Sequence, residues 1–325
     1  MTVSAIIVTY NPDMALLRMS AGSLVPQVGR LYIIDNGSAE ADAIAAEFGG
    51  GNVSVVPLGG NRGIAAATNA ALDLLRADGA DWVITSDQDT AYPPDYVDTF
   101  LRLLASCPYG TDSVAAFVPV FHDGVLGGTS PVYVRGRGFM RRAAPDGPYT
   151  RVAQAIASGM LVNMAVLDKV GPMDGSLFID MVDSEWCWRA NGRGLCIVCL
   201  RDLEVSHRLG DRAARLGPWR VAVRSPARHY YMTRNGIHLA LRSPYLPLPD
   251  RGLLLVKSLR FILLYPLLCD DKLLNLRSAL RGLLDALRGR LGRMGPDGVV
   301  SAASGGCPGS VPAEPVPVAS AHTRA

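Results

Sequence analysis

Two acidic clusters in this chain have the composition of a catalytic site. The first is Asp87-Gln88-Asp89, which directly follows the apolar run Trp82–Thr85. Two carboxylates two residues apart in a short turn can present their oxygens to one hard divalent cation, such as Mg²⁺ or Mn²⁺. Such a cation would also take phosphate oxygens and would neutralise a departing diphosphate. The alternative is a helix-capping turn, because Pro93-Pro94 follows and opens the next expected helix.

The second cluster lies in the Trp-rich segment Gly171–Arg189, which carries Asp180, Asp183 and Glu185 among large apolar side chains. Apolar neighbours desolvate a carboxylate and raise its proton affinity. A carboxylate of that kind can act as the general base that removes a proton from a hydroxyl group. The competing interpretation is an amphipathic helix whose acids face water while its aromatic side chains pack inward.

Further polar residues follow other predicted strands. Asp35 begins the sequence Asp-Asn-Gly-Ser and could accept hydrogen bonds from a ribose or a base edge, or it could simply hold a turn. Asn61-Arg62-Gly63 opens a predicted helix, where free backbone N–H groups favour an anion, and its simpler interpretation is a loop and cap. His207 could place an imidazole near a metal or diphosphate, although a lone histidine is more often structural.

Alternating strands and helices are expected to position these residues. Short β-branched or apolar runs alternate with longer helical patterns up to about residue 120, which predicts an α/β fold with a mainly parallel sheet flanked by helices. Ligands of such sheets bind beyond the carboxyl ends of the strands. Asn11 and Pro12 are expected to cap and open the first helix, and another is expected from Gly63 to Ala77. The predicted strands are 3–9, 30–34, 53–57, 82–85 and 113–118.

The middle of the chain offers fewer signals. Residues 121–157 are rich in Gly, Pro and Arg, which indicates loops with short strands beside the sheet. A helix is expected near 165–169, ended by Gly171-Pro172. Cys196 and Cys199 have zinc-knuckle spacing but lie in an apolar run without a second pair, which favours a buried strand. The six cysteines are scattered and are expected to be reduced.

The C-terminal third combines leucine with arginine. The apolar stretch 253–269 and the Leu- and Arg-rich stretch 273–291 together suit an amphipathic element lying on a membrane surface. The alternative is a helical hairpin packed on the catalytic domain. From Gly295 onward Gly, Pro, Ser and Ala dominate, which predicts a disordered tail. The expected division is a catalytic domain at 1–240, a helical extension at 241–294 and a tail at 295–325.

Bulk properties restrict the partners and the location. Formal net charge is only +3, with 32 Lys and Arg against 29 Asp and Glu, which gives no reason to expect a nucleic-acid partner. No basic segment precedes the first apolar run, and no stretch reaches the length of a membrane-spanning helix. We therefore expect a cytoplasmic protein held peripherally on the inner face of the plasma membrane.

These motifs, in this order, resemble a known family. The chain is similar to the family 2 inverting glycosyltransferases with the GT-A fold, and among them to the bacterial rhamnosyltransferases that build surface polysaccharides. Its Asp-Gln-Asp and Phe-Ile-Asp-x-Val-Asp-x-Glu-Trp forms are the specific part, whereas the N-terminal blocks fit many sugar transferases. The matching blocks are 5–12, 34–38, 61–65, 82–89, 158–159, 177–189, 207–210 and 230–235.

The resemblance implies a role for each matching residue. Asp183 matches the family's general base and Glu185 supports it, but the family's common Glu-Asp pair is Val182-Asp183 here, which leaves Glu185 as a rival base. The nucleotide is expected at Thr9, Tyr10, Asn11, Asp35, Asn61, Gly63 and Asp87. The metal is expected at Asp87, Asp89 and His207, with Asp89 as a direct ligand. The donor sugar or acceptor is expected beside Ser158, Gly159, Asp180, Trp186 and Arg234.

The implied reaction is one in-line displacement that inverts the configuration of the sugar. Resemblance alone suggests dTDP-rhamnose as the donor and a hydroxyl of a polysaccharide or lipid-linked glycan as the acceptor. A nicotinamide-dependent oxidoreductase is the less favoured alternative, because Thr9 to Pro12 stand where its G-x-G-x-x-G motif should be. A non-catalytic membrane scaffold with the same fold is the other alternative, and the presence of Asp87, Asp89 and Asp183 together argues against it.

Overall fold

The computed structural model describes residues 1–123, 130–207, 212–216, 219–223, 225–263, 269 and 271–295. At residues 122–123 and 206–207, and in the strands between 212 and 223, it describes the backbone alone. The predicted tail lies outside the described residues except for Gly295.

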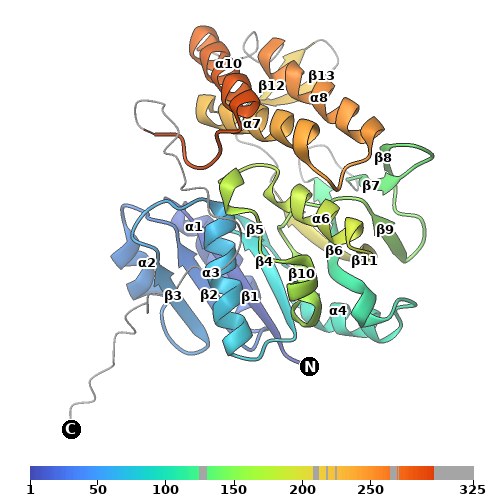
Figure 1. Ribbon diagram of the computed structural model, residues 1–325. Coiled ribbons are helices and arrows are strands. Elements are labelled where there is room, and N and C mark those ends of the chain that lie inside the picture. The colour runs from blue at the N-terminus through green and yellow to red at the C-terminus, as the bar shows by residue number, and fades with distance from the viewer. Residues whose placement is uncertain are drawn as a thin grey trace.

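One mixed sheet forms the centre of the molecule (Figure 1). Its strand order is β3-β2-β1-β4-β10-β6-β11-β5, and β9 also pairs with β11. The first four strands in this order are parallel, while β10 runs antiparallel to both of its neighbours. The sheet strands are β1 (Val3–Thr9), β2 (Leu31–Asp35), β3 (Val53–Pro57), β4 (Trp82–Asp87), β5 (Thr90–Ala91), β6 (Val114–Asp123), β9 (Tyr149–Val152), β10 (Met160–Asn163) and β11 (Cys196–His207). The predicted α/β fold with a mainly parallel sheet is confirmed.

Alternation along β1 explains how the sheet is covered on both faces. Ile6 packs in the core on the side of α3 (Ile64–Ala77), and Ile7 packs in the core that contains Leu17 of α1 (Met14–Leu24). Successive side chains of a strand point to opposite faces, so an apolar run such as β1 serves two cores. The remaining helices of this part are α2 (Ala41–Phe48), α4 (Tyr96–Ala105), α5 (Leu167–Val170) and α6 (Val182–Gly192).

The predicted start of the first helix is wrong by two residues. Asp13 is the N-cap, and its Oδ1 accepts hydrogen bonds from the N–H groups of Ala15 at 2.8 Å and Leu16 at 3.3 Å. Asn11 instead has a φ of 44° and uses its side chain to accept from Ala39 N–H. Asn11 therefore belongs to the loop between β1 and α1, and Asp13 caps the helix instead.

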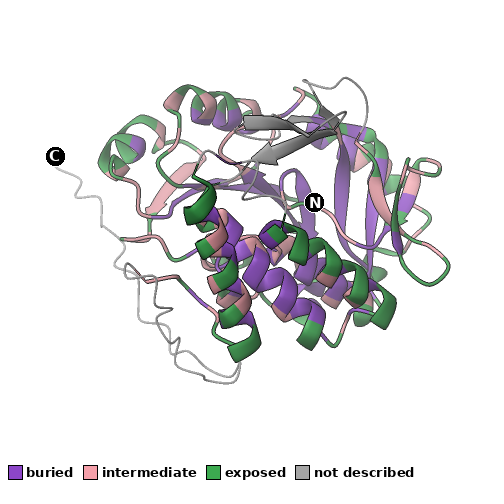
Figure 2. Cartoon of the chain, turned by 90° about the horizontal axis from the view of Figure 1, so that it is seen from above, coloured by how far each residue is buried: buried purple, intermediate pink, exposed green. Residues whose placement is uncertain are grey.

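Three C-terminal helices form a second layer beyond the carboxyl ends of β1 and β4 (Figure 1). They are α7 (Pro226–Arg242), α8 (Leu248–Leu263) and α10 (Lys272–Arg288). Both α8 and α10 pack on α7, and Figure 2 shows exposed residues in green along the outside of this layer. Among the described helices, none is both long enough and apolar enough to cross a bilayer. Two hairpins complete the fold, β7 (Val132–Arg135) with β8 (Met140–Ala143) and β12 (Arg212–Leu216) with β13 (Trp219–Val223).

The cysteine pair in the apolar run is part of the core. Cys196 and Cys199 lie in β11 and are buried, as the sequence predicted for a buried strand. Burial raises the pKa of the Cys199 thiol to about 12. A buried thiol of that kind behaves as a small apolar core group.

Candidate active site

The loop after β1 is tied to the acidic turn after β4 by one side chain. Gln88 Oε1 accepts hydrogen bonds from Thr9 Oγ1 and from Tyr10 N–H, each at 2.9 Å. Thr9 is fully buried, whereas the Tyr10 side chain is exposed. Of the predicted nucleotide residues in this loop, Tyr10 therefore offers an accessible ring, and Thr9 anchors the loop. Gln88 had no predicted role, although its position between two aspartates was a signal.

Asp35 supports a turn. Its side chain is fully buried, and its carboxylate accepts hydrogen bonds from the N–H groups of Gly37 and Ser38 at 3.1–3.3 Å. Ser38 Oγ in turn accepts from Asn11 N–H at 2.8 Å. These contacts agree with the turn interpretation, and the contact between Asp35 and a nucleoside stays a prediction.

Asn61 and Gly63 build the junction between this loop region and the Trp-rich segment. Asn61 Oδ1 accepts from Gly63 N–H at 3.0 Å and from Asn36 Nδ2 at 3.2 Å. Gly63 has a φ of +87°, and a Cβ there would lie 2.6 Å from Phe178 O. Only glycine permits this backbone conformation and this close approach without strain. Both residues therefore shape the loop, and their contact with a nucleotide stays a prediction.

Asp183 combines partial exposure with a perturbed proton affinity. It stands in the first turn of α6, where Oδ1 accepts from Ser184 N–H at 2.7 Å and Oδ2 accepts from Ala157 N–H at 3.2 Å. Burial raises the pKa of Asp183 to about 6, the charges of Asp87 and Asp180 act in the same direction, and the two backbone hydrogen bonds oppose them. A carboxylate whose pKa lies near neutrality is suited to general-base catalysis.

The segment Ala157-Ser158-Gly159 brings Asp183 beside the acidic turn. Ser158 Oγ shares a hydrogen bond of 2.6 Å with Thr90 Oγ1 and accepts one from Asp87 N–H at 3.4 Å. Gly159 N–H donates to Thr85 O at 2.7 Å. Ser158 is only 1% exposed and links the end of β4 to the start of β5, while its place beside the sugar stays a prediction. Gly159 is also buried and has a φ of +75°, where a Cβ would lie 2.9 Å from Pro119 Cγ.

The turn after β4 has the ligands for part of a cation site. Asp87 and Asp89 are partly exposed there, and the backbone of His207 pairs with that of Thr90, the next residue of the turn. The His207 side chain lies outside the described residues. No three described His, Cys, Asp or Glu side chains form a complete metal site. Magnesium is commonly held by one or two carboxylates with phosphates and water, so this pair fits such an ion.

The loop that precedes α6 is held by α7. Phe178, Asp180 and Met181 all have positive φ angles, which side chains seldom adopt without external support. Arg228 binds Asp180 through two hydrogen bonds, from Nε to Oδ2 at 2.8 Å and from Nη2 to Oδ1 at 2.6 Å. Asn235 Nδ2 contacts the carbonyl oxygens of residues 177, 179 and 180 at 2.8–2.9 Å. The sequence analysis assigned no role to Arg228 or Asn235.

Arg234 is a structural residue in the same clamp. It is fully buried, and its guanidinium donates to Leu177 O at 2.9 Å, to Gly292 O at 2.5 Å and to Asn235 Oδ1 at 2.9 Å. These contacts give Arg234 a structural position, and its place beside the donor or acceptor stays a prediction. The interaction joins the segment after α10 to the loop before α6.

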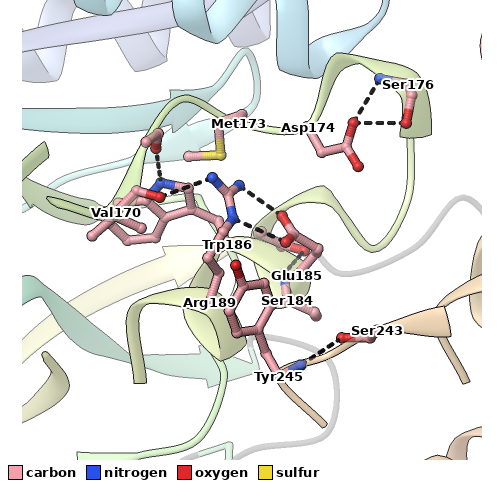
Figure 3. Close-up of polar contacts among 12 residues, drawn as sticks. Val170, Met173, Asp174, Ser176, Ser184, Glu185, Trp186, Arg189, Ser243 and Tyr245 are labelled. Atoms are coloured by element: carbon pink, nitrogen blue, oxygen red, sulfur yellow. Dashed lines mark hydrogen bonds and ion pairs between the residues drawn. The ribbon is translucent and has the colours of Figure 1, made fainter. Parts of the chain in front are cut away.

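Glu185 and Trp186 of α6 contact Arg189 and the segment around Gly171 (Figure 3). Glu185 is buried and forms a two-pronged ion pair with Arg189, with N–O distances of 2.8 and 2.9 Å. Trp186 is fully buried and its Nε1 donates to Gly171 O at 3.0 Å. Trp186 packs in the core, and its place beside the donor or acceptor stays a prediction. Because Glu185 is neutralised by its partner, the geometry favours Asp183 as the base.

Comparison with known proteins decides the class of this site. Residues 4–146 match Glycosyl transferase family 2. The chain carries a family 2 glycosyltransferase domain. It is 28% identical over 299 residues to "dTDP-rhamnosyl transferase RfbF" of Shigella flexneri, a match that covers 89% of this chain and 97% of the relative.

Solved structures place the glycosyltransferase in the GT-A fold. TarS 1–349 of S. aureus in complex with UDP-GlcNAc superposes with a TM-score of 0.53 at 15% identity, covering 88% of this chain and 81% of that one. GalNAc-T7 with UDP, GalNAc and Mn²⁺ gives 0.53 at 14% identity, covering 82% and 58%. The predicted family and fold are confirmed, and the oxidoreductase alternative is excluded.

Proposed function

We propose that this glycosyltransferase moves rhamnose from dTDP-rhamnose to a hydroxyl group of a polysaccharide or lipid-linked glycan, with inversion at the anomeric carbon. The observation that carries the proposal is the position of Asp183, partly exposed, with a raised pKa, and within electrostatic reach of Asp87. Direct displacement of a diphosphate by a hydroxyl group needs a base for the hydroxyl proton and a positive charge near the leaving diphosphate.

The chemical step uses one base. Asp183 accepts the proton of the acceptor hydroxyl, and the acceptor oxygen forms a bond to the anomeric carbon. The bond from that carbon to the diphosphate oxygen breaks, and the nucleoside diphosphate leaves with the electron pair. A single displacement of this kind inverts the configuration. Ala157 and Ser184 hold the Asp183 carboxylate in place through their N–H groups.

Asp87 and Asp89 would hold Mg²⁺ or Mn²⁺ together with the diphosphate, and the side chain of His207 is proposed as a further ligand. When bound, the cation supplies charge neutralisation for the leaving group. The charge of Asp87 contributes to the raised pKa of Asp183, which places negative charge beside the proposed cation site.

The choice of donor rests on the rhamnosyltransferase relative, which this chain matches over almost its full length. Exposed Tyr10 is the described residue of the β1 loop that could stack on a base. The polysaccharide or lipid-linked acceptor is proposed from the family resemblance alone.

A thermal-shift panel tests the donor first. The purified chain is mixed with dTDP-rhamnose, dTDP-glucose, UDP-GlcNAc or UDP-GalNAc, each with Mn²⁺ or with EDTA. We expect the largest shift with dTDP-rhamnose and Mn²⁺. Proton NMR of the product anomer with a simple acceptor then tests inversion. A retained configuration, or a shift with a UDP-sugar alone, would reject the corresponding part of the proposal.

A further inference from the structure

The outer face of the helical layer exposes apolar side chains at helical spacing. On α10 these are Leu273, Leu280, Leu284 and Leu287, with exposed fractions from 42% to 79%. On α8 they are Leu253, Val256, Leu259 and Leu263, with exposed fractions from 36% to 68%. Spacings of three and four residues put the members of each set on one side of their helix.

The opposite sides of α8 and α10 pack closely on α7. A Cβ at Gly236 of α7 would lie 2.1 Å from Ser258 Oγ of α8, and a Cβ at Gly282 of α10 would lie 2.5 Å from Tyr230 O of α7. Such close approach fixes the faces of α8 and α10 that turn inward. Figure 1 places both helices on the side of α7 away from the sheet. Because the buried sides of α8 and α10 pack on α7, their exposed leucines lie on the opposite sides.

The charges of this face have one dominant sign. The acids within the two helices are buried: Asp250 is paired with Arg135, and Asp285 accepts from Tyr230 OH at 3.0 Å. Among the described residues from 248 to 295, Asp271 is the exposed carboxylate. The exposed cations of the same range are Lys257, Arg260, Lys272, Arg277, Arg288, Arg290 and Arg293.

We propose that this outer face of α8 and α10 binds an anionic lipid bilayer. The leucines enter the boundary between head groups and acyl chains, and the basic side chains meet lipid phosphates. A second copy of the chain is a poorer occupant, because a self-complementary contact would bring the same cations together. Membrane binding does not require turnover, so the proposal stands independently of the donor, the acceptor and the assigned base.

Vesicle flotation tests the proposal with the full chain. Phosphatidylcholine vesicles are compared with vesicles of phosphatidylcholine and phosphatidylglycerol, at low and high salt. We expect the protein to float with the anionic vesicles at low salt, to bind neutral vesicles weakly and to be partly released by salt. Equal binding to both compositions, or no binding to either, would overturn the proposal.

Two variants separate the apolar contribution from the basic one. L280Q/L284Q/L287Q and R277E/R288E should each reduce binding to the anionic vesicles by at least about tenfold. R141E/R142E, which reverses two exposed arginines on β8, is the matched control and should bind as wild type does. Circular dichroism checks folding, and the charge-reversal pair serves as the test if the glutamine variant unfolds. Sedimentation showing a dimer that L280Q/L284Q/L287Q dissociates would assign the face to a second copy instead.

Discussion

Asp87 and Asp183 lie close enough for the charge of one to raise the pKa of the other, although they come from distant parts of the chain. The segment Ala157-Ser158 links them, since Ser158 Oγ accepts from Asp87 N–H and Ala157 N–H donates to Asp183 Oδ2. The proposed cation-binding turn and the proposed base are thus linked through one short backbone segment, which would allow both to act on one donor.

The activity should have an acidic limb set by Asp183. Its pKa is raised to about 6, and only its deprotonated form can accept the hydroxyl proton. We expect kcat/KM to fall about tenfold per pH unit below that value. Raising the Mn²⁺ concentration should move the limb to lower pH, because a cation offsets the charge of Asp87. A pH profile that is flat between pH 5 and 8, about where the base titrates, would contradict the assignment.

Asp183→Asn should abolish transfer while leaving nucleotide affinity within a few fold. It should also change the pH dependence of stability. The pKa of Asp183 is higher in the native state than in the unfolded state. This difference stabilises wild-type protein fully below the ordinary pKa of an aspartate, and the stabilisation is lost as pH rises through about 6. The free energy of unfolding of the variant relative to wild type should therefore rise by on the order of 2–3 kcal/mol between pH 4 and pH 8. Urea unfolding in EDTA measures the difference.

Glu185→Gln should lower the stability of the protein and keep its transfer activity, unlike Asp183→Asn, which should abolish transfer. Its ion pair with Arg189 is buried, and removal of one partner leaves the guanidinium uncompensated, at a cost of roughly 3 kcal/mol in stability. The folded fraction should keep measurable transfer activity, since the base is intact. Thermal unfolding and activity per folded molecule are the two measurements. Complete loss of activity in a folded variant would restore Glu185 as the base.

Asp89→Asn should weaken nucleotide binding only when a cation is present. The change keeps the size of the side chain and removes one charged oxygen ligand. In calorimetry we expect a loss of about tenfold or more in affinity with Mn²⁺ and little change with EDTA. An equal loss in both conditions would show that Asp89 holds the turn and not a metal.

Asn235→Ala should lower kcat with little effect on the Kd of the nucleotide. Asn235 holds three carbonyl oxygens of the loop that carries Asp180 and leads into α6. Asn191→Ala is the matched control, because Asn191 Nδ2 also contacts three carbonyl oxygens but lies at the far end of α6. The control should lose stability without a selective loss of kcat. Equal effects of both variants on kcat would argue against a positioning role for Asn235.

Local pattern was enough to predict most elements that carry the site. Strands β1 and β3 have the predicted bounds, because uninterrupted β-branched and apolar runs leave few other conformations. The first helix begins at Met14 and not after Asn11, because the Asn11 side chain bonds Ala39 across the loop. A capping preference is a local signal, and a contact to a distant residue can override it.

The sequence by itself determined the α/β class and the two acidic clusters, since both follow from residue type and short-range spacing, and the resemblance of its motifs indicated the family. The sequence could not distinguish acidic residues that face the candidate site from acidic residues that stabilise the fold. Glu185 pairs with Arg189 one helical turn away, and Asp35 accepts hydrogen bonds from the backbone of its own turn. The pKa of Asp183, in contrast, is raised in part by the charge of Asp87. Only the tertiary structure decides this, because the proton affinity and exposure of a carboxylate depend on neighbours brought from distant parts of the chain.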